Sequence, residues 1–164
     1  MRFNILYMFI AIVGATGFKT VESSEIALAR IYFEKASTSE SAAKSLKAIT
    51  DAKTNDVLKA YNGAALAILA KYAWSPYKKL DNVNKGLALL NSAVKSSSSD
   101  VEIRFLRFAI EENLPAIISA TRHLQEDKTF ILKNLVKTHP NYKSIKNYLI
   151  LSKSLSATEK KALN

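Results

Sequence analysis

Apolar residues recur at intervals of three and four along most of this chain, and this spacing is what most restricts its fold. Within residues 76–95 they line one side of a helix: Leu80, Val83, Leu87, Leu90 and Val94. An α-helix has about 3.6 residues per turn, so such spacing produces one apolar face. Glycine and proline, which interrupt helices, number only four and three among 164 residues. No segment alternates apolar and polar residues over the length of a strand, and the pattern therefore predicts an all-α fold.

The periodicity divides the chain into seven or eight helices. Because the connections between them are short, we expect antiparallel helical hairpins in one domain, packed as a bundle or an irregular array. The expected ranges are 24–36, 40–50, 56–73, 76–95, 100–113, 115–136, 140–153 and 157–162. An alternative divides the sixth range near residues 125–127, with Asp127 as the N-cap of the second piece. Ser75 and Pro76 are typical of an N-cap and a first helical position.

The first twenty residues have the order of a secretory signal. Arg2 precedes residues 5–13, which are uncharged, and small residues follow at Ala15 and Gly17. We expect residues 1–20 to be removed, leaving a domain of residues 21–164 in the periplasm or outside the cell. The alternative is a retained membrane anchor, but the apolar run is shorter than the roughly 20 residues that span a bilayer. No stable membrane span is therefore expected after cleavage.

The charge balance is basic, and the chain has no cysteine. Lysine and arginine number 24 against 14 acidic residues, which gives a net charge of +10. In a cytosolic chain this excess would suggest nucleic acid, but an exported chain is more apt to meet anionic envelope surfaces. Because the lysines are spread singly, they also suit ordinary solubility, and we expect no nucleic-acid partner. The lack of cysteine excludes disulfides, thiolate nucleophiles and cysteine metal sites.

Small residues concentrate within residues 56–73. Gly63, Ala64, Ala65, Ala67 and Ala70 make this helix thin on several sides. Glycine inside a helix costs about 1 kcal/mol relative to alanine. We therefore expect a neighbouring helix to approach closely here.

The stretch 101–115 contains five charged residues within an otherwise apolar helix. Ser99 and Glu102 match a capping box, and an apolar face follows at Ile103, Leu106 and Ile110. The opposite face carries the residues predicted as a possible partner-binding patch: Arg104, Arg107, Phe108 and Glu111. Arg107 and Glu111 are four apart and could pair. Three interpretations of this face remain: a later helix covers Phe108, a partner binds it, or the exposure of Phe108 has no function.

A second possible partner-binding cluster combines aromatic and basic residues. It comprises Tyr72, Trp74 and Tyr77 together with Lys71, Lys78 and Lys79. Such a set could stack on a sugar or on an aromatic side chain of a peptide. Alternatively, the aromatic residues fold the long connection down onto the helical hairpin.

The sequence offers few residues that could form a metal site or a catalytic site. His123, Glu126 and Asp127 are spaced so that a helix could present all three to a metal, but His139 is the only other histidine and there is no cysteine. Glu111 and Glu112 are adjacent, so on a helix they diverge by about 100° and cannot converge on one atom. No glycine-rich phosphate loop or nucleophile elbow is present. We expect no catalytic residues, no metal and no cofactor.

Part of the chain resembles a tetratricopeptide hairpin. Gly86, Leu90 and Ala93 match the order of its second helix, and Gly63 with Leu66 matches its first helix loosely. The spacing from Gly63 to Gly86 is longer than the usual pattern because of the insertion KYAWSPYKKLDN. The stretches AYNGAALAILAKYAWSPYKKL, GLALLNSAV and VEIRFLRFAIEENLP also resemble uncharacterised exported bacterial helical proteins with tetratricopeptide-like hairpins, across roughly residues 57–135. This resemblance implies a fold and an envelope address, and no catalytic residue.

These observations together favour a non-enzymatic module of the cell envelope or periplasm that binds a protein or peptide. Stacked helical hairpins form concave surfaces suited to that role. One alternative is a carrier or binder of an anionic glycan or lipid, which the basic charge and the aromatic-basic cluster support. The other is an enzyme whose catalytic groups converge from distant helices.

Overall fold

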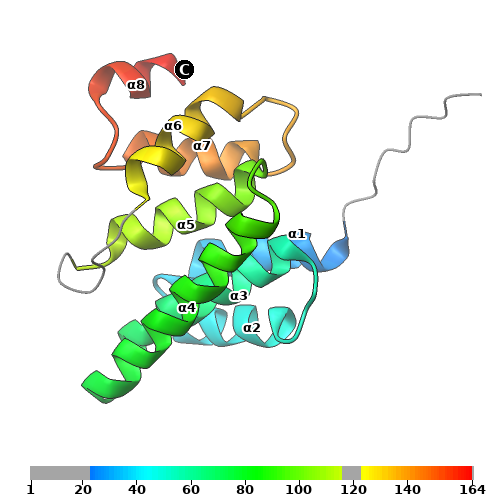
Figure 1. Cartoon of the computed structure of the whole chain (residues 1–164), viewed down its shortest axis with the longest axis vertical. Coiled ribbons are helices and arrows are strands. Elements are labelled where there is room, and N and C mark those ends of the chain that lie inside the picture. Colours follow the sequence, from blue (N-terminus) through cyan, green and yellow to red (C-terminus); the bar gives the residue numbers. More distant parts are fainter. Residues whose placement is uncertain (1–22, 116–122, 164) are drawn as a thin grey trace, which may run out of the picture.

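The computed structural model describes residues 23–115 and 123–163, and within them every regular element is helical (Figure 1). This confirms the predicted all-α class. The described ranges contain eight α-helices and one 3-10 turn: α1 Ser24–Ala36, α2 Glu40–Thr50, α3 Asp56–Leu69, η1 Ala70–Tyr72, α4 Pro76–Ser96, α5 Val101–Asn113, α6 Leu124–Asn134, α7 Tyr142–Leu151 and α8 Ala157–Ala162. The predicted signal peptide, residues 1–20, lies outside the described residues.

Helix α5 runs through the middle of the molecule. Figure 1 shows α2 and α3 below it and α6 to α8 above it, while α4 rises from the lower left past the near end of α5. Aromatic rings connect α1 to α7 across α5. Phe33 of α1 packs edge-on against Phe105 of α5, and Phe105 packs edge-on against Tyr148 of α7, with ring centroids 6.2 and 5.3 Å apart. The core is therefore centred on α5.

Most helix ends agree with the sequence prediction because local signals define them. α1, α2 and α8 begin and end where expected, and Ser75 accepts a hydrogen bond from the backbone of Lys78 as the N-cap of α4, with Pro76 following. The predicted range 56–73 ends earlier, at Leu69, and continues as the 3-10 turn. The predicted ranges 115–136 and 140–153 are shorter in the structure, as α6 and α7. Residues 116–122 of the former lie outside the described part.

The alternative break near residues 125–127 lies close to the observed start of α6, but the predicted capping role of Asp127 is wrong. A single helix, α6, begins at Leu124 and runs through these residues, so Asp127 lies inside it and caps nothing. Its side chain is fully buried and binds two arginines of α5 instead. The side chain of Asp127 therefore forms buried ion pairs and does not cap a helix.

Helices α3 and α4 approach closely at two glycines, which confirms the expected close packing of α3 against a neighbour. A Cβ atom added to Gly63 would lie 2.7 Å from the carbonyl oxygen of Gly86. A Cβ atom added to Gly86 would lie 2.6 Å from the carbonyl oxygen of Gly63 and 2.9 Å from the backbone nitrogen of Ala67. The two backbones are in contact, so no side chain fits at either position.

Helix α5 is capped one residue later than the sequence suggested. Asp100, not Ser99, is the N-cap, and its carboxylate accepts hydrogen bonds from the backbone of Glu102 and Ile103 at 2.8 and 3.0 Å. The predicted capping box of Ser99 and Glu102 is therefore wrong. Glu102 turns into the protein, where other helices supply its partners.

The larger correction concerns the sides of α5. All residues from 101 to 111 are buried, including the charged face that sequence periodicity placed outside: Arg104, Arg107, Phe108 and Glu111. Phe108 is 0% exposed and contacts the ring of Tyr148. Helix α6 packs against the side of α5 that carries the charged residues. The interpretation in which later helices cover Phe108 therefore agrees with the structure, and a partner cannot reach these four side chains.

Candidate functional site

The arginines of α5 share one buried carboxylate. Arg107 donates to both carboxylate oxygens of Asp127, from Nε at 2.7 Å and from Nη2 at 2.8 Å, and Arg104 donates to the same carboxylate at 2.9 Å. Asp127 is 0% exposed. Arg104 also donates to the neighbouring Glu126, and this hydrogen bond holds the pKa of Glu126 below its usual value. The expected pairing of Arg107 with Glu111 does not form, because α6 provides a better-placed partner.

Glu111 and Glu112 bind different neighbours. Glu111 accepts from the backbone nitrogen of His123 at 2.6 Å and lies 2.9 Å from the Nδ1 atom of its ring. Glu112 accepts from Tyr148 of α7 at 2.8 Å and from Ser152 at 2.5 Å. Burial disfavours the charge on Glu112, but hydrogen bonds led by that from Ser152 outweigh it and lower its pKa. The two carboxylates diverge, as their adjacent positions predicted.

The buried carboxylate of Glu102 is a third place where side chains from several elements meet. Arg30 of α1 binds its carboxylate with two hydrogen bonds of 2.7 and 2.6 Å, Tyr61 of α3 donates at 2.6 Å, and Asn141 donates at 3.0 Å. Burial of Tyr61, together with the nearby Glu102 charge, raises the pKa of its hydroxyl well above the usual value. This junction connects the elements on either side of α5. We call the interactions of Glu102, Arg104, Arg107 and Glu111 the α5 charge network.

The candidate metal ligands do not converge. Asp127 is bound by arginines, His123 faces Glu111, and Glu126 is 57% exposed on the outer side of Arg104. Among the residues that the structure describes, no group of three histidine or acidic side chains is placed to hold a metal ion. The histidine and acidic side chains considered as metal ligands thus have partners within the fold.

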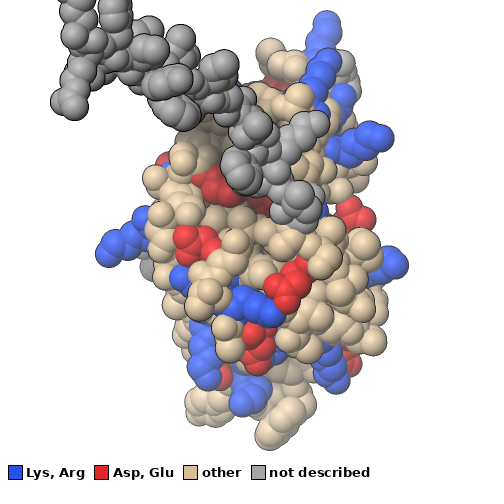
Figure 2. All heavy atoms as spheres, turned by 90° about the vertical axis from the view of Figure 1, so that its right-hand side faces the viewer, with Lys and Arg blue, Asp and Glu red and all other residues tan. Residues whose placement is uncertain are grey.

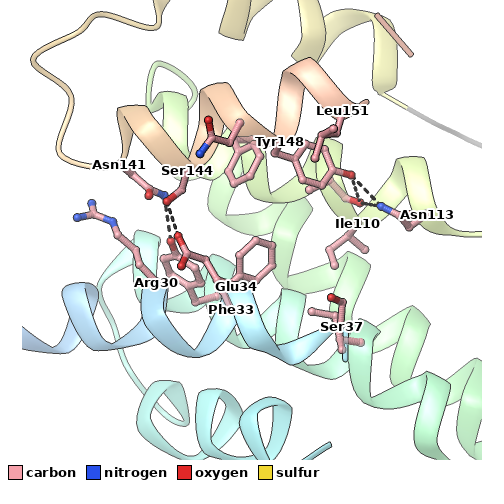
Figure 3. Close-up of a pocket in the computed structure, with 15 residues that line it drawn as sticks. Arg30, Phe33, Glu34, Ser37, Ile110, Asn113, Asn141, Ser144, Tyr148 and Leu151 are labelled. Carbon is pink, nitrogen blue, oxygen red and sulfur yellow. Dashed lines mark hydrogen bonds between the residues drawn. The ribbon is translucent and has the colours of Figure 1, made fainter. Parts of the chain in front are cut away.

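A hollow of about 430 Å³ lies between α1, α5 and α7. Its lining includes Phe105 and Ile110, which are buried and so form an apolar floor, and the exposed polar residues Glu34, Asn113 and Asn147, which form its rim. Figure 3 shows Glu34 of α1 facing Ser144 of α7, whose hydroxyl donates a hydrogen bond to the Glu34 carboxylate. The hollow is open along one side, so it forms a groove rather than a closed cavity.

A second hollow of about 450 Å³ continues the first. The two share four lining residues: Ser37, Ile68, Ile110 and Asn113. The second is largely apolar and extends between the ends of α3, α4 and α5 to Lys71 and Lys79. We call the two hollows together the central groove. Sequence reasoning missed it because its walls come from segments far apart in the chain.

The aromatic-basic cluster divides into two parts. Tyr72 and Lys71 fold back toward the end of α1: the Tyr72 hydroxyl lies 3.3 Å from the carbonyl oxygens of Ala36 and Ser37, and Lys71 donates to Ser37 at 2.9 Å. Trp74 and Tyr77, in contrast, are 91% and 88% exposed. Tyr72 therefore holds the connection between α3 and α4 against the end of α1, whereas Trp74 and Tyr77 are exposed and accessible to a partner.

The remaining basic residues are dispersed. Figure 2 shows lysine and arginine scattered over one face, many of them at its edges and some between acidic residues, rather than in a single block. Within the described residues, no helix is both long enough and apolar enough to cross a bilayer. Comparison with protein-family models, with curated proteins and with solved structures finds no match for this chain. Inference about function therefore depends on the two exposed features, the central groove and the connection between α3 and α4.

Proposed function

We propose that this protein is a non-enzymatic module that binds an extended peptide segment of another protein, and that the central groove is the binding site. The observation that carries the proposal is an open groove with an apolar floor and a polar rim. Peptide-binding sites combine apolar pockets for side chains with polar groups that pair with the peptide backbone. The proposed place of action, the cell envelope or periplasm, depends on the predicted signal peptide.

The rim offers groups suited to a peptide backbone. Asn147 of α7 lines the groove, is exposed, and makes no side-chain hydrogen bond within the described residues. A side-chain amide both donates and accepts, so it can pair with a peptide bond in either direction. Leu151, one turn further along α7, is 82% exposed at the same rim and could cover an apolar side chain of the peptide.

The alternatives have weaker support. Each hollow has the volume of a small-ligand site, but a carrier encloses most of the surface of its ligand, and both hollows are open. An enzyme would need an acid and a base that converge on one substrate atom. The charged residues of α5 instead bind partners inside the fold, and this supports binding rather than acid–base catalysis.

A displayed library of random peptides, selected against the full chain, tests the proposal. A selected peptide should bind about tenfold more weakly to Leu151→Gln than to the unchanged protein, because burying a leucine contributes roughly 1.5–3 kcal/mol. Val136→Gln is the matched control, since Val136 is also an exposed aliphatic residue, at 56%, and does not line the groove. Dissociation constants follow from fluorescence anisotropy of the labelled peptide. Peptides that tolerate both substitutions equally would show that the groove is not their site.

A further inference from the structure

We propose that the connection between α3 and α4 docks on the surface of an anionic phospholipid bilayer. We call residues 71–80 the α3–α4 tip. Trp74 and Tyr77 have the highest exposures among the large apolar side chains of the described residues, and Leu80 nearby is 49% exposed. A single exposed apolar residue is ordinary, but three within seven positions form a patch. Lys71 and Lys79 also stand at the end of the central groove, but Trp74, Tyr77 and Lys78 do not line it, so Trp74→Ala tests the tip without changing the groove.

The charge of the tip fits an anionic surface. Lys71, Lys78 and Lys79 are all exposed, and the sequence has no acidic residue from position 57 to position 80. Within the described residues, Lys78 and Lys79 form no ion pair. They stand in the first turns of α4, which has no acidic residue in its first turn. Cations at the start of a helix oppose its dipole, so folding stability alone does not account for them.

The shape of the tip favours a bilayer over a peptide or a small molecule. Figure 1 shows the start of α4 projecting from the rest of the helices. Peptides and small ligands bind in concave sites, whereas a projecting tip can meet a broad surface. Tryptophan and tyrosine favour the boundary between headgroups and acyl chains, and lysines beside them are attracted to anionic headgroups.

The tip is also held in place before any contact. Tyr72 and Lys71 bind the end of α1, and Ser75 caps α4 immediately after Trp74. Docking would therefore require little ordering of the backbone, which reduces the entropic cost of binding. The same contacts orient Trp74 and Tyr77 away from the core.

Trp74 is the only tryptophan, so its fluorescence reports directly on the tip. The full chain is mixed with vesicles that contain phosphatidylglycerol, and separately with vesicles of phosphatidylcholine alone. We expect the emission of Trp74 to shift to the blue, and the protein to sediment, only with the anionic vesicles. Binding should weaken as salt concentration rises, because screening reduces the attraction between lysines and headgroups.

The double variant Lys78→Glu with Lys79→Glu should bind anionic vesicles at least about thirty-fold more weakly. It should fold normally, because glutamate three residues after Ser75 completes a capping box and suits the helix dipole. Lys137→Glu with Lys143→Glu is the control: both lysines are exposed and the net charge changes equally. Trp74→Ala should likewise reduce sedimentation with anionic vesicles.

Three results would overturn the proposal. The first is equal loss of binding in the tip variant and in the control, which would indicate a general charge effect. The second is sedimentation with vesicles without a blue shift of Trp74, which would place the contact in another segment. The third is the same blue shift with soluble dextran sulfate, which would make an anionic glycan, rather than a lipid surface, the partner of the tip.

Discussion

Replacing Asp127 with alanine is expected to lower the free energy of unfolding by about 3–5 kcal/mol, because it leaves two guanidinium groups buried without their shared carboxylate. Arg104 and Arg107 both donate to Asp127, which is 0% exposed. Removing one partner of a buried ion pair costs far more than the pair itself contributes, since the remaining charge stays out of water. The measurement is the urea dependence of unfolding, followed by circular dichroism at neutral pH.

Glu126→Ala is the control for this prediction. Glu126 is the neighbouring acidic residue and binds Arg104, but it is 57% exposed, so its loss should cost less than about 1 kcal/mol. Replacing the two arginines and Asp127 together with apolar residues of similar size should recover much of the loss. Equal effects of Asp127→Ala and Glu126→Ala would mean that α6 does not cover α5 in this way.

Gly86→Leu should destabilise the fold by about 3 kcal/mol or more, the upper part of the range for overpacking. The first added atom would already lie 2.6 Å from the carbonyl oxygen of Gly63, and this obstacle is backbone, which cannot rotate away. Helices α3 and α4 would have to separate, exposing apolar surface along their contact. Thermal and urea unfolding both report the change.

Ala88→Leu provides the comparison, because Ala88 is exposed on the same helix. It should alter the free energy of unfolding by no more than about 0.5 kcal/mol. A stable Gly86→Leu variant, within 1 kcal/mol (about a fivefold change in the unfolding equilibrium) of the unchanged protein, would show that the two helices are not in backbone contact.

The helices could be predicted from the sequence because their signals are local. Periodic apolar residues identify each helix, and residues such as Ser75 and Pro76 define where α4 begins. The close approach of some neighbouring helix to α3 was also predictable, since Gly63 has no other evident reason to lie inside a helix. What periodicity does not contain is the identity of the neighbour on each side of a helix.

Helix α5 shows the consequence of that limit. A helical wheel separates its apolar side from its charged side but assumes that the charged side faces water. Two signals argue otherwise: Phe108 lies among the charges, and the start of α6, with its N-cap His123, carries hydrogen-bonding partners for them in reverse order. Going up α5, the arginines come before Glu111, and going up α6, His123 comes before Asp127. Antiparallel packing therefore places Asp127 against the two arginines and the ring of His123 against Glu111.

The binding surfaces depend still more on tertiary structure. The central groove joins residues such as Glu34, Asn113 and Asn147, which no local pattern brings together. In the α3–α4 tip, three aromatic residues lie within six positions, yet Tyr72 binds the end of α1 whereas Trp74 and Tyr77 are exposed. Their roles differ because the chain turns between them, and that turn is set by contacts with α1.

Hydrogen exchange of the backbone amides in α5 tests most directly the claim that this charged helix is the interior support of the molecule. If α5 is buried on all sides, its amides should exchange only through global unfolding, and their protection should equal the full free energy of unfolding. Helix α8, which has no buried residue, should exchange much faster. Exchange in α5 as fast as in α8 would contradict the account.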